Sequence, residues 1–139
     1  MNDKFFIDSN VLVYAYDQHD PNKQKTAQTV LTEAIKKGNA TVSTQVIGEF
    51  FTIVTKKIPT PLSADDAYEV IKTLAVFPVL HIDIGMVHRA IETHTQYGIS
   101  YWDSLILAAA ERAGCTRVLT EDLQHRGTYH GLQVVNPFV

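Results

Sequence analysis

The sequence predicts an α/β protein, in a three-layer α/β/α arrangement with a parallel sheet of about five strands between helices. Short apolar segments alternate with stretches whose apolar residues follow helical spacing, a pattern typical of βα units. The short segments are apolar at nearly every position, as expected of strands covered by helices on both faces. Three of the helical stretches stop at Gly38, Gly98 and Gly114, where a left-handed residue commonly ends a helix.

Five segments are expected to form the strands, and a short helical turn is expected after Asp122, before the last strand. The strands are Lys4–Asp8, Ala40–Thr44, Pro78–Ile82, Arg117–Thr120 and Leu132–Val135.

Six segments are expected to form the helices. Pro59 and Pro61 end the third helix, and Ser63 with Asp66 has the spacing of a capping box for the fourth. The helices are Asn10–Tyr16, Asn22–Lys37, Gln45–Lys57, Ala64–Val76, Ile84–Tyr97 and Trp102–Ala113.

Bulk properties indicate one globular domain over residues 1–139, because no repeat or linker divides the chain. Hydrophobic residues make up 45% and charged residues 19%, which is ordinary for a soluble protein. No run of 18 apolar residues predicts a membrane span, and the first residues lack a signal-peptide pattern. The lone Cys115 fits a reducing compartment, so we expect a cytoplasmic protein.

The formal net charge of −3 argues against a nucleic-acid binder that works through overall basicity. It leaves a nuclease open, because a carboxylate site adds negative charge that bound metal offsets. RNA contact would then depend on local basic residues or on a partner. The candidates for that path, for which a solvated surface is the default interpretation, are Lys56, Lys57, Arg112, Arg117 and Arg126.

Four acidic residues lie where a predicted strand passes into a helix or within the first turns of a helix. They are Asp8, Glu49, Asp103 and Asp122. Parallel sheets gather ligands at the carboxyl ends of their strands, so these side chains are expected to meet in one crevice. Crowded carboxylates repel one another unless a cation or a raised pKa neutralises them, and Mg²⁺ prefers oxygen ligands. The set predicts a metal-dependent site that hydrolyses phosphate esters.

Each acid also has a purely structural interpretation. Asp8, Ser9 or Asn10 would serve as a helix N-cap, although a charge at the end of the apolar PhePheIle run needs a partner. Asp103 follows Ser100 by three residues, which is the capping-box spacing.

The other two acids differ in how well capping explains them. Glu49 flanks an apolar helical stripe beyond the first turn, so capping does not account for it, and Lys56 is about two turns away. Asp122 competes with Glu121 for the position after the fourth strand, and spacing alone does not choose between them.

Other chemistries find little support. The six histidines lack zinc-site spacing, although His125 and His130 lie in the loop after Asp122, within possible reach of a substrate. No G-x-S-x-G, P-loop or GxGxxG motif is present, which argues against serine hydrolases, NTPases and dinucleotide enzymes.

Over its whole length the chain resembles the PIN-domain ribonucleases, and among them the VapC-like toxins of toxin–antitoxin modules. The resemblance is carried by FIDSNVLVYAYD, by the helix with Glu49, by YWDSLILAAAERAGC and by RVLTEDLQHRGTYHGLQVVNPF. It implies that Asp8, Glu49, Asp103 and Asp122 form the acidic quartet, which Asn10 and Thr120 support.

The resemblance further implies an endoribonuclease that depends on Mg²⁺ or Mn²⁺, forms a homodimer and is held inactive by a cognate antitoxin protein. Structured RNA such as tRNA, or a ribosomal RNA loop, is the implied substrate. A PIN-fold RNA-processing nuclease without a toxin role, or a non-catalytic scaffold, is the alternative.

Two unrelated classes fit the residues less well. A haloacid-dehalogenase-type phosphatase commonly has an aspartate two residues after its nucleophile, where this chain has Asn10. A receiver-like signalling domain needs a late lysine, and no lysine follows Lys72.

Overall fold

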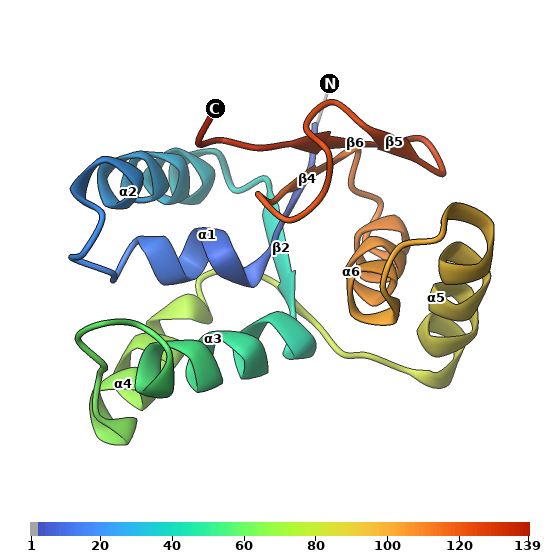
Figure 1. Ribbon diagram of the computed structural model, residues 1–139. Coiled ribbons are helices and arrows are strands. Elements are labelled where there is room, and N and C mark those ends of the chain that lie inside the picture. The colour runs from blue at the N-terminus through green and yellow to red at the C-terminus, as the bar shows by residue number, and fades with distance from the viewer. Residues whose placement is uncertain (1–2) are drawn as a thin grey trace.

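The computed structural model describes residues 3–139 and is built around one six-stranded sheet (Figure 1). In spatial order the strands run β3-β2-β1-β4-β6-β5. Every neighbouring pair is parallel except β5 and β6, which are antiparallel. The strands are β1 (Phe5–Ile7), β2 (Ala40–Ser43), β3 (Val79–Leu80), β4 (Arg117–Leu119), β5 (Thr128–Tyr129) and β6 (Leu132–Val135).

Helices cover both faces of this sheet, which confirms the predicted α/β/α layers. Figure 1 shows the first four helices on one side and the last two on the other. The helices are α1 (Ser9–Tyr14), α2 (Pro21–Lys37), α3 (Thr44–Lys56), α4 (Ala64–Leu74), α5 (Ile84–Tyr97) and α6 (Tyr101–Arg112). The predicted segments agree with the observed ones to within two residues at each end.

The segment after β4 differs from the prediction. Residues 121–127 form bends and a turn instead of a short helix, and they lead into β5, a sixth strand that was not predicted. The backbone N–H of Arg126 donates to the carbonyl of Val134 at 2.9 Å, and the N–H of Val134 donates to the carbonyl of Gly127 at 2.8 Å, so the end of this segment bonds to β6. A two-residue loop, His130 and Gly131, then joins β5 to β6 with positive φ at both positions (50° and 82°).

Local signals at the helix ends match the sequence. The Ser63 hydroxyl accepts a hydrogen bond from the backbone N–H of Asp66 at 3.1 Å, as a cap should. Gly38 and Gly98 take left-handed backbone conformations (φ 62° and 70°) after α2 and α5. Gly98 ends α5 and the Ser100 N-cap begins α6, so these two residues fix where Asp103 lies.

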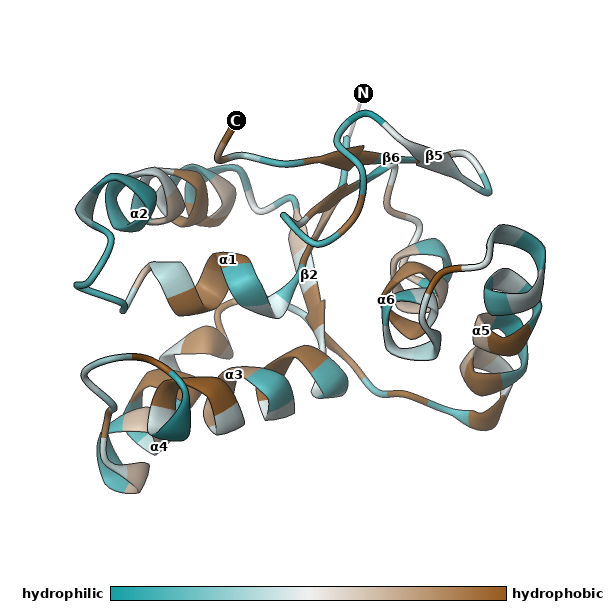
Figure 2. Ribbon diagram, in the orientation of Figure 1, coloured by the Kyte–Doolittle hydropathy of each residue, from teal (hydrophilic) through white to brown (hydrophobic). Residues whose placement is uncertain are grey.

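The core fills the space between sheet and helices. Phe6, Ile7 and Val118 on the central strands are fully buried, as is Phe50 of α3. Figure 2 shows hydrophobic residues along α3 and α6, whereas the start of α2 is hydrophilic. Within residues 3–139, no helix combines the length and the apolarity needed to span a bilayer.

Candidate functional site

Asp8 is the centre of a polar cluster at the carboxyl end of β1. Its side chain is 4% exposed and directly follows the buried strand. Oδ1 accepts a hydrogen bond from the backbone N–H of Ser9 at 2.7 Å, and Oδ2 accepts one from the Thr120 hydroxyl at 2.8 Å. Asp8 is also the N-cap of α1. Asp8 is therefore both a helix cap and the central member of the polar cluster.

Asn10 links Asp8 to the loop that follows β4. Its side-chain amide donates to Thr120 Oγ1 at 3.0 Å and to Asp122 Oδ2 at 3.1 Å, and lies 3.4 Å from Asp8 Oδ2. The backbone N–H of Asp122 also donates to Thr120 Oγ1 at 3.1 Å. Asn10 and Thr120 thus hold two of the predicted acids close together, although the chain separates those acids by more than a hundred residues.

Glu49 joins the cluster from the second turn of α3. Its carboxylate accepts hydrogen bonds from the Ser9 hydroxyl at 3.1 Å and from Gln45 Nε2 at 3.2 Å. The same Ser9 hydroxyl lies 3.4 Å from Asp8 Oδ1. Ser9 therefore stands between the two carboxylates, and polar neutral groups satisfy the half-buried Glu49.

Asp103 approaches from the first turn of α6. Its backbone N–H donates to the capping hydroxyl of Ser100 at 3.1 Å, so the capping interpretation is correct for Ser100. Burial raises the pKa of Asp103, and the negative charge of Asp122 raises it further. Gln45 Nε2 also donates to the backbone carbonyl of Trp102 at 3.1 Å, which ties the start of α6 to α3.

The structure separates Asp122 from its rival Glu121. The carboxylate of Glu121 turns away from the cluster and accepts hydrogen bonds from the Tyr14 hydroxyl at 2.7 Å and from Lys23 Nζ at 2.9 Å. Asp122 is exposed and bonded to Asn10. Of the two acids after β4, Asp122 is therefore the one placed among the other carboxylates.

The electrostatics of the cluster are those of uncompensated negative charge. Burial raises the pKa of Asp8 to about 7, and the charges of Asp122 and Glu49 add to that effect. Hydrogen bonds from Thr120 and Ser9 act in the opposite direction, because they stabilise the carboxylate. A cation at this position would keep Asp8 ionised at neutral pH.

The donor set fits a hard divalent cation, because four carboxylates and the neighbouring amide and hydroxyl groups offer only oxygen ligands. Gln45 Oε1 is buried without a hydrogen-bond partner beside Glu49, which leaves one further acceptor for an incoming donor. Within residues 3–139, however, no three His, Cys, Asp or Glu side chains form a ready-made cage. Ser9 lies between the carboxylates of Asp8 and Glu49, and Asn10 lies between those of Asp8 and Asp122. A bound cation would therefore have to draw these carboxylates together.

Several residues of this site gave no signal in the sequence. The sequence indicates Ser9 only as an alternative helix cap, and Gln45 only as the first residue of a helix. Lys23 and Tyr14, which hold Glu121, come from α2 and α1. Their spacing from the loop after β4 carries no local pattern, so only the folded chain reveals them.

Other candidate groups lie elsewhere or are already engaged. His125 Nδ1 accepts a hydrogen bond from the backbone N–H of Asn136 at 2.9 Å. His130 Nε2 lies 3.0 Å from the hydroxyl oxygen of Thr93 on α5. Arg112 is paired with Asp83 at 2.7 Å. These contacts give the three side chains structural partners.

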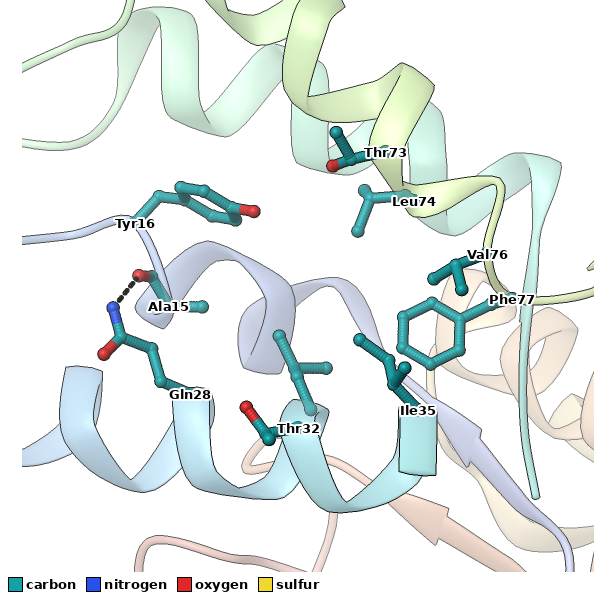
Figure 3. Close-up of a pocket in the computed structure, with 10 residues that line it drawn as sticks. Ala15, Tyr16, Gln28, Thr32, Ile35, Thr73, Leu74, Val76 and Phe77 are labelled. Carbon is teal, nitrogen blue, oxygen red and sulfur yellow. Dashed lines mark hydrogen bonds between the residues drawn. The ribbon is translucent and has the colours of Figure 1, made fainter. Parts of the chain in front are cut away.

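A cavity of about 270 Å³ lies apart from the acids, between α2 and the end of α4 (Figure 3). Ile35, Leu74 and Phe77 line it, and Gln28 at its edge donates to the carbonyl of Ala15 at 2.9 Å. None of the four predicted acids contributes to its lining. The acid cluster, and not this cavity, is therefore the candidate for hydrolytic chemistry.

Comparison with known families settles what kind of domain carries this cluster. The family model of the PIN domain matches residues 5–130. The chain belongs to the PIN domain family. No protein with a curated description matches it significantly.

Solved structures share this PIN fold at low sequence identity. VapC20 of Mycobacterium tuberculosis, a toxin that cleaves the sarcin–ricin loop, is 18% identical with a TM-score of 0.70, over 86% of this chain and 90% of that one. A toxin–antitoxin complex from Klebsiella pneumoniae is 17% identical with a TM-score of 0.71, over 96% and 98%. VapBC2 of Rickettsia felis, bound to a promoter DNA fragment, is 18% identical with a TM-score of 0.67, over 94% and 96%. The PIN domain therefore has a VapC-like fold.

Proposed function

We propose that this PIN domain protein is a metal-dependent endoribonuclease whose active site is the acid cluster. The observation that carries the proposal is the arrangement around Asp8, where Asn10 and Ser9 connect it to Asp122 and Glu49. Burial raises the pKa of Asp8, the charges of Asp122 and Glu49 raise it further, and a bound cation would keep the carboxylate ionised. Membership of the PIN family supports nuclease chemistry over a phosphatase or a receiver.

The proposed roles of the four acids start from Asp8, the one that is buried. Asp8 and Asp103 are the principal ligands of Mg²⁺ or Mn²⁺. When bound, the cation supplies Lewis-acid stabilisation of the charge that develops on the phosphate oxygens and activates water. Asp122, which is exposed, and Glu49 orient the attacking water or complete the ligand set. Asn10 and Thr120 hold the side chains of Asp8 and Asp122 in fixed positions relative to each other. The products of cleavage carry a 5′-phosphate and a 3′-hydroxyl.

We further propose a biological setting as a toxin, with structured RNA such as tRNA as target. This rests on the fold shared with a Klebsiella toxin–antitoxin complex and with a toxin that cleaves a ribosomal RNA loop. A cognate antitoxin and a homodimer are parts of the same proposal. Expression of the chain alone should arrest bacterial growth, and expression of an Asp8→Asn variant should not. Arrest by both variants, or by neither, would contradict the toxin role.

Cleavage of total cellular RNA by the purified protein, with Mg²⁺, Mn²⁺ or EDTA, tests the nuclease itself. Discrete fragments should form with metal and vanish with EDTA. Asp8→Asn should lose roughly 100-fold to 1000-fold in rate, the order expected when a group that stabilises transition-state charge is removed. Asp65→Asn, an exposed acid on α4, is the matched control and should cut normally.

Retained far-ultraviolet circular dichroism in both variants would show that loss of cleavage is not loss of fold. Equal cleavage by Asp8→Asn and wild type would refute the assignment of the site. Absence of cleavage by a folded, metal-loaded wild type would favour the non-catalytic scaffold.

A further inference from the structure

Trp102 carries an exposed aromatic side chain on the first turn of α6, the turn that also carries Asp103 of the acid cluster. It is 61% exposed, it lies in the first turn of α6, and the next residue is Asp103. It is also the only tryptophan in the chain. An exposed tryptophan offers a large, rigid surface of the kind on which ligand groups and nucleobases stack.

The backbone under Trp102 is fixed by the same residue that binds Glu49. Gln45 Nε2 donates to the Trp102 carbonyl at 3.1 Å and to Glu49 Oε2 at 3.2 Å. The Tyr101 ring packs edge-on against the indole, with ring centroids 5.0 Å apart. The backbone that carries the indole is therefore tied to Glu49 through Gln45, while most of the Trp102 side chain stays open to solvent.

We propose that Trp102 is a nucleobase-stacking platform, which holds an unpaired nucleotide of the RNA next to the phosphodiester bond at the acid cluster. This rests on the proposed ribonuclease function and adds a feature of the substrate: the RNA is single-stranded or unstacked at the cut. Stacking on aromatic side chains is the usual way proteins hold unpaired bases. With Asp103 as the neighbouring residue, the phosphate of a stacked nucleotide lies within reach of the cluster.

The charge of the chain favours this mode of binding. At a net charge of −3, and with carboxylates at the site, the overall charge of the protein does not attract RNA. Stacking needs no positive charge, and every base presents a π face. An exposed indole can therefore bind RNA through its bases even though the protein and its substrate are both negatively charged.

The surroundings of Trp102 favour a base over a protein partner. A protein interface would be expected to extend Trp102 into a wider apolar patch. Yet Ser100 is exposed, and the exposed Ile84 lies at the start of α5, beside the Asp83–Arg112 ion pair at the opposite end of α6. Ten residues of helix separate Arg112 from Trp102, about 15 Å.

Fluorescence of this single tryptophan reports stacking directly. The Asp8→Asn protein with Mg²⁺ is titrated with a mixed-sequence single-stranded RNA octamer and with an abasic octamer of the same charge. Quenching by the RNA and not by the abasic strand is expected. Equal quenching by both, or none by either, would overturn the platform, and so would a concentration-dependent burial of Trp102 against a second copy of the chain.

Kinetics on the RNA that the wild type cleaves provide a second readout. Trp102→Ala should raise KM about 10-fold to 100-fold, the loss expected from one stacked base, with kcat little changed. Trp102→Phe should restore most of the loss. Tyr68→Ala is the control, because Tyr68 is 59% exposed on α4, across the sheet, with Lys72 over its ring at 5.0 Å.

The two proposals fail separately. Normal kinetics of Trp102→Ala in an active enzyme would overturn the platform and leave the nuclease intact. Base-dependent quenching in a protein that cleaves no RNA would remove the nuclease and leave a base-binding site. Thermal melting of each variant confirms that the surface substitutions leave the fold unchanged.

Discussion

Asp8 has two structural roles, and they favour opposite protonation states of its carboxyl group. As N-cap of α1 it is favoured as a carboxylate, because it accepts the N–H of Ser9 near the positive end of the helix. As a buried group beside Glu49 and Asp122 it is favoured as the neutral acid, and the net result is a pKa of about 7. Without a cation, the ionised form is therefore costly to the fold.

This conflict predicts the pH dependence of stability of the metal-free protein. The folded state binds the proton more tightly than the unfolded chain, whose ordinary value is 3.8. The stabilisation is therefore fully present below about pH 4 and is lost as pH rises through 7, by up to about 4 kcal/mol. Urea unfolding between pH 4.5 and 8 should show the free energy of unfolding falling with pH.

Two variants isolate Asp8 as the cause. Asp8→Asn should flatten this slope, and Asp65→Asn, an exposed acid, should keep it. Added Mg²⁺ should stabilise the wild type more at pH 8 than at pH 5. A wild-type profile that stays flat or rises between pH 5 and 7 would contradict the assignment.

From the sequence, four acids at strand-to-helix junctions or in the first turns of helices were predicted to converge, and the structure brings those positions to one end of the sheet. Their catalytic role remains a prediction. The sequence did not separate Asp122 from Glu121, because the deciding contacts come from Tyr14 and Lys23, about a hundred residues earlier. The role of Ser9 between two carboxylates was hidden for a similar reason: it depends on how α3 is placed against α1.

At the scale of elements, Glu121 fastens the loop after β4 to two helices. Its carboxylate bonds Tyr14 of α1 and Lys23 of α2, and its backbone N–H donates to Asn10 at 3.3 Å. Lys23 Nζ also lies 4.7 Å from the centre of the Tyr14 ring. This contact holds the loop that positions Asp122 and Thr120.

Glu121→Ala should therefore impair cleavage more than stability. We expect a loss of about 1 kcal/mol in unfolding free energy, since the pair is partly exposed, but a clear fall in kcat with metal present. Glu69→Ala, which breaks the exposed Glu69–Lys72 pair on α4, is the matched control and should change neither. Unchanged kcat in Glu121→Ala would show that the loop keeps its position without this contact.

Two glycines at different places in helices should respond oppositely to alanine. Gly98 ends α5 with φ 70°, so Gly98→Ala should destabilise by about 1 kcal/mol. Gly48 lies inside α3, and an added Cβ would meet nothing within 4 Å, so Gly48→Ala should stabilise by roughly 0.5–1 kcal/mol. Thermal melts measure both changes, and the same sign for the two variants would be inconsistent with these conformations.

Most elements were predictable because each has a local signal, as the glycine at the end of α5 and the serine cap of α4 show. β5 was missed because it has two residues and forms only as the partner of β6. Its loop contains His130 at positive φ, where Asn or Gly is the usual hairpin signal. The helix predicted after Asp122 does not form for the same reason: backbone groups of Arg126 and Gly127 form hydrogen bonds with Val134 of β6.

For the whole molecule, one continuous core implies one folding unit. Strands from both halves of the chain pair at the centre of the sheet, with β1 between β2 and β4. The metal-free protein should therefore unfold in one transition, with calorimetric and van't Hoff enthalpies equal. Two resolved transitions, or an enthalpy ratio far from one, would contradict a single domain over residues 1–139.

The order of the strands also determines how copies of this chain can meet. The outermost strands, β3 and β5, have only two residues each. An edge that short offers too few free backbone groups to recruit a strand from a neighbour, so continuous sheets across molecules and strand-by-strand aggregation are disfavoured. Self-association of this protein would accordingly have to use its helical surfaces, where side chains and not backbone groups decide which partner fits.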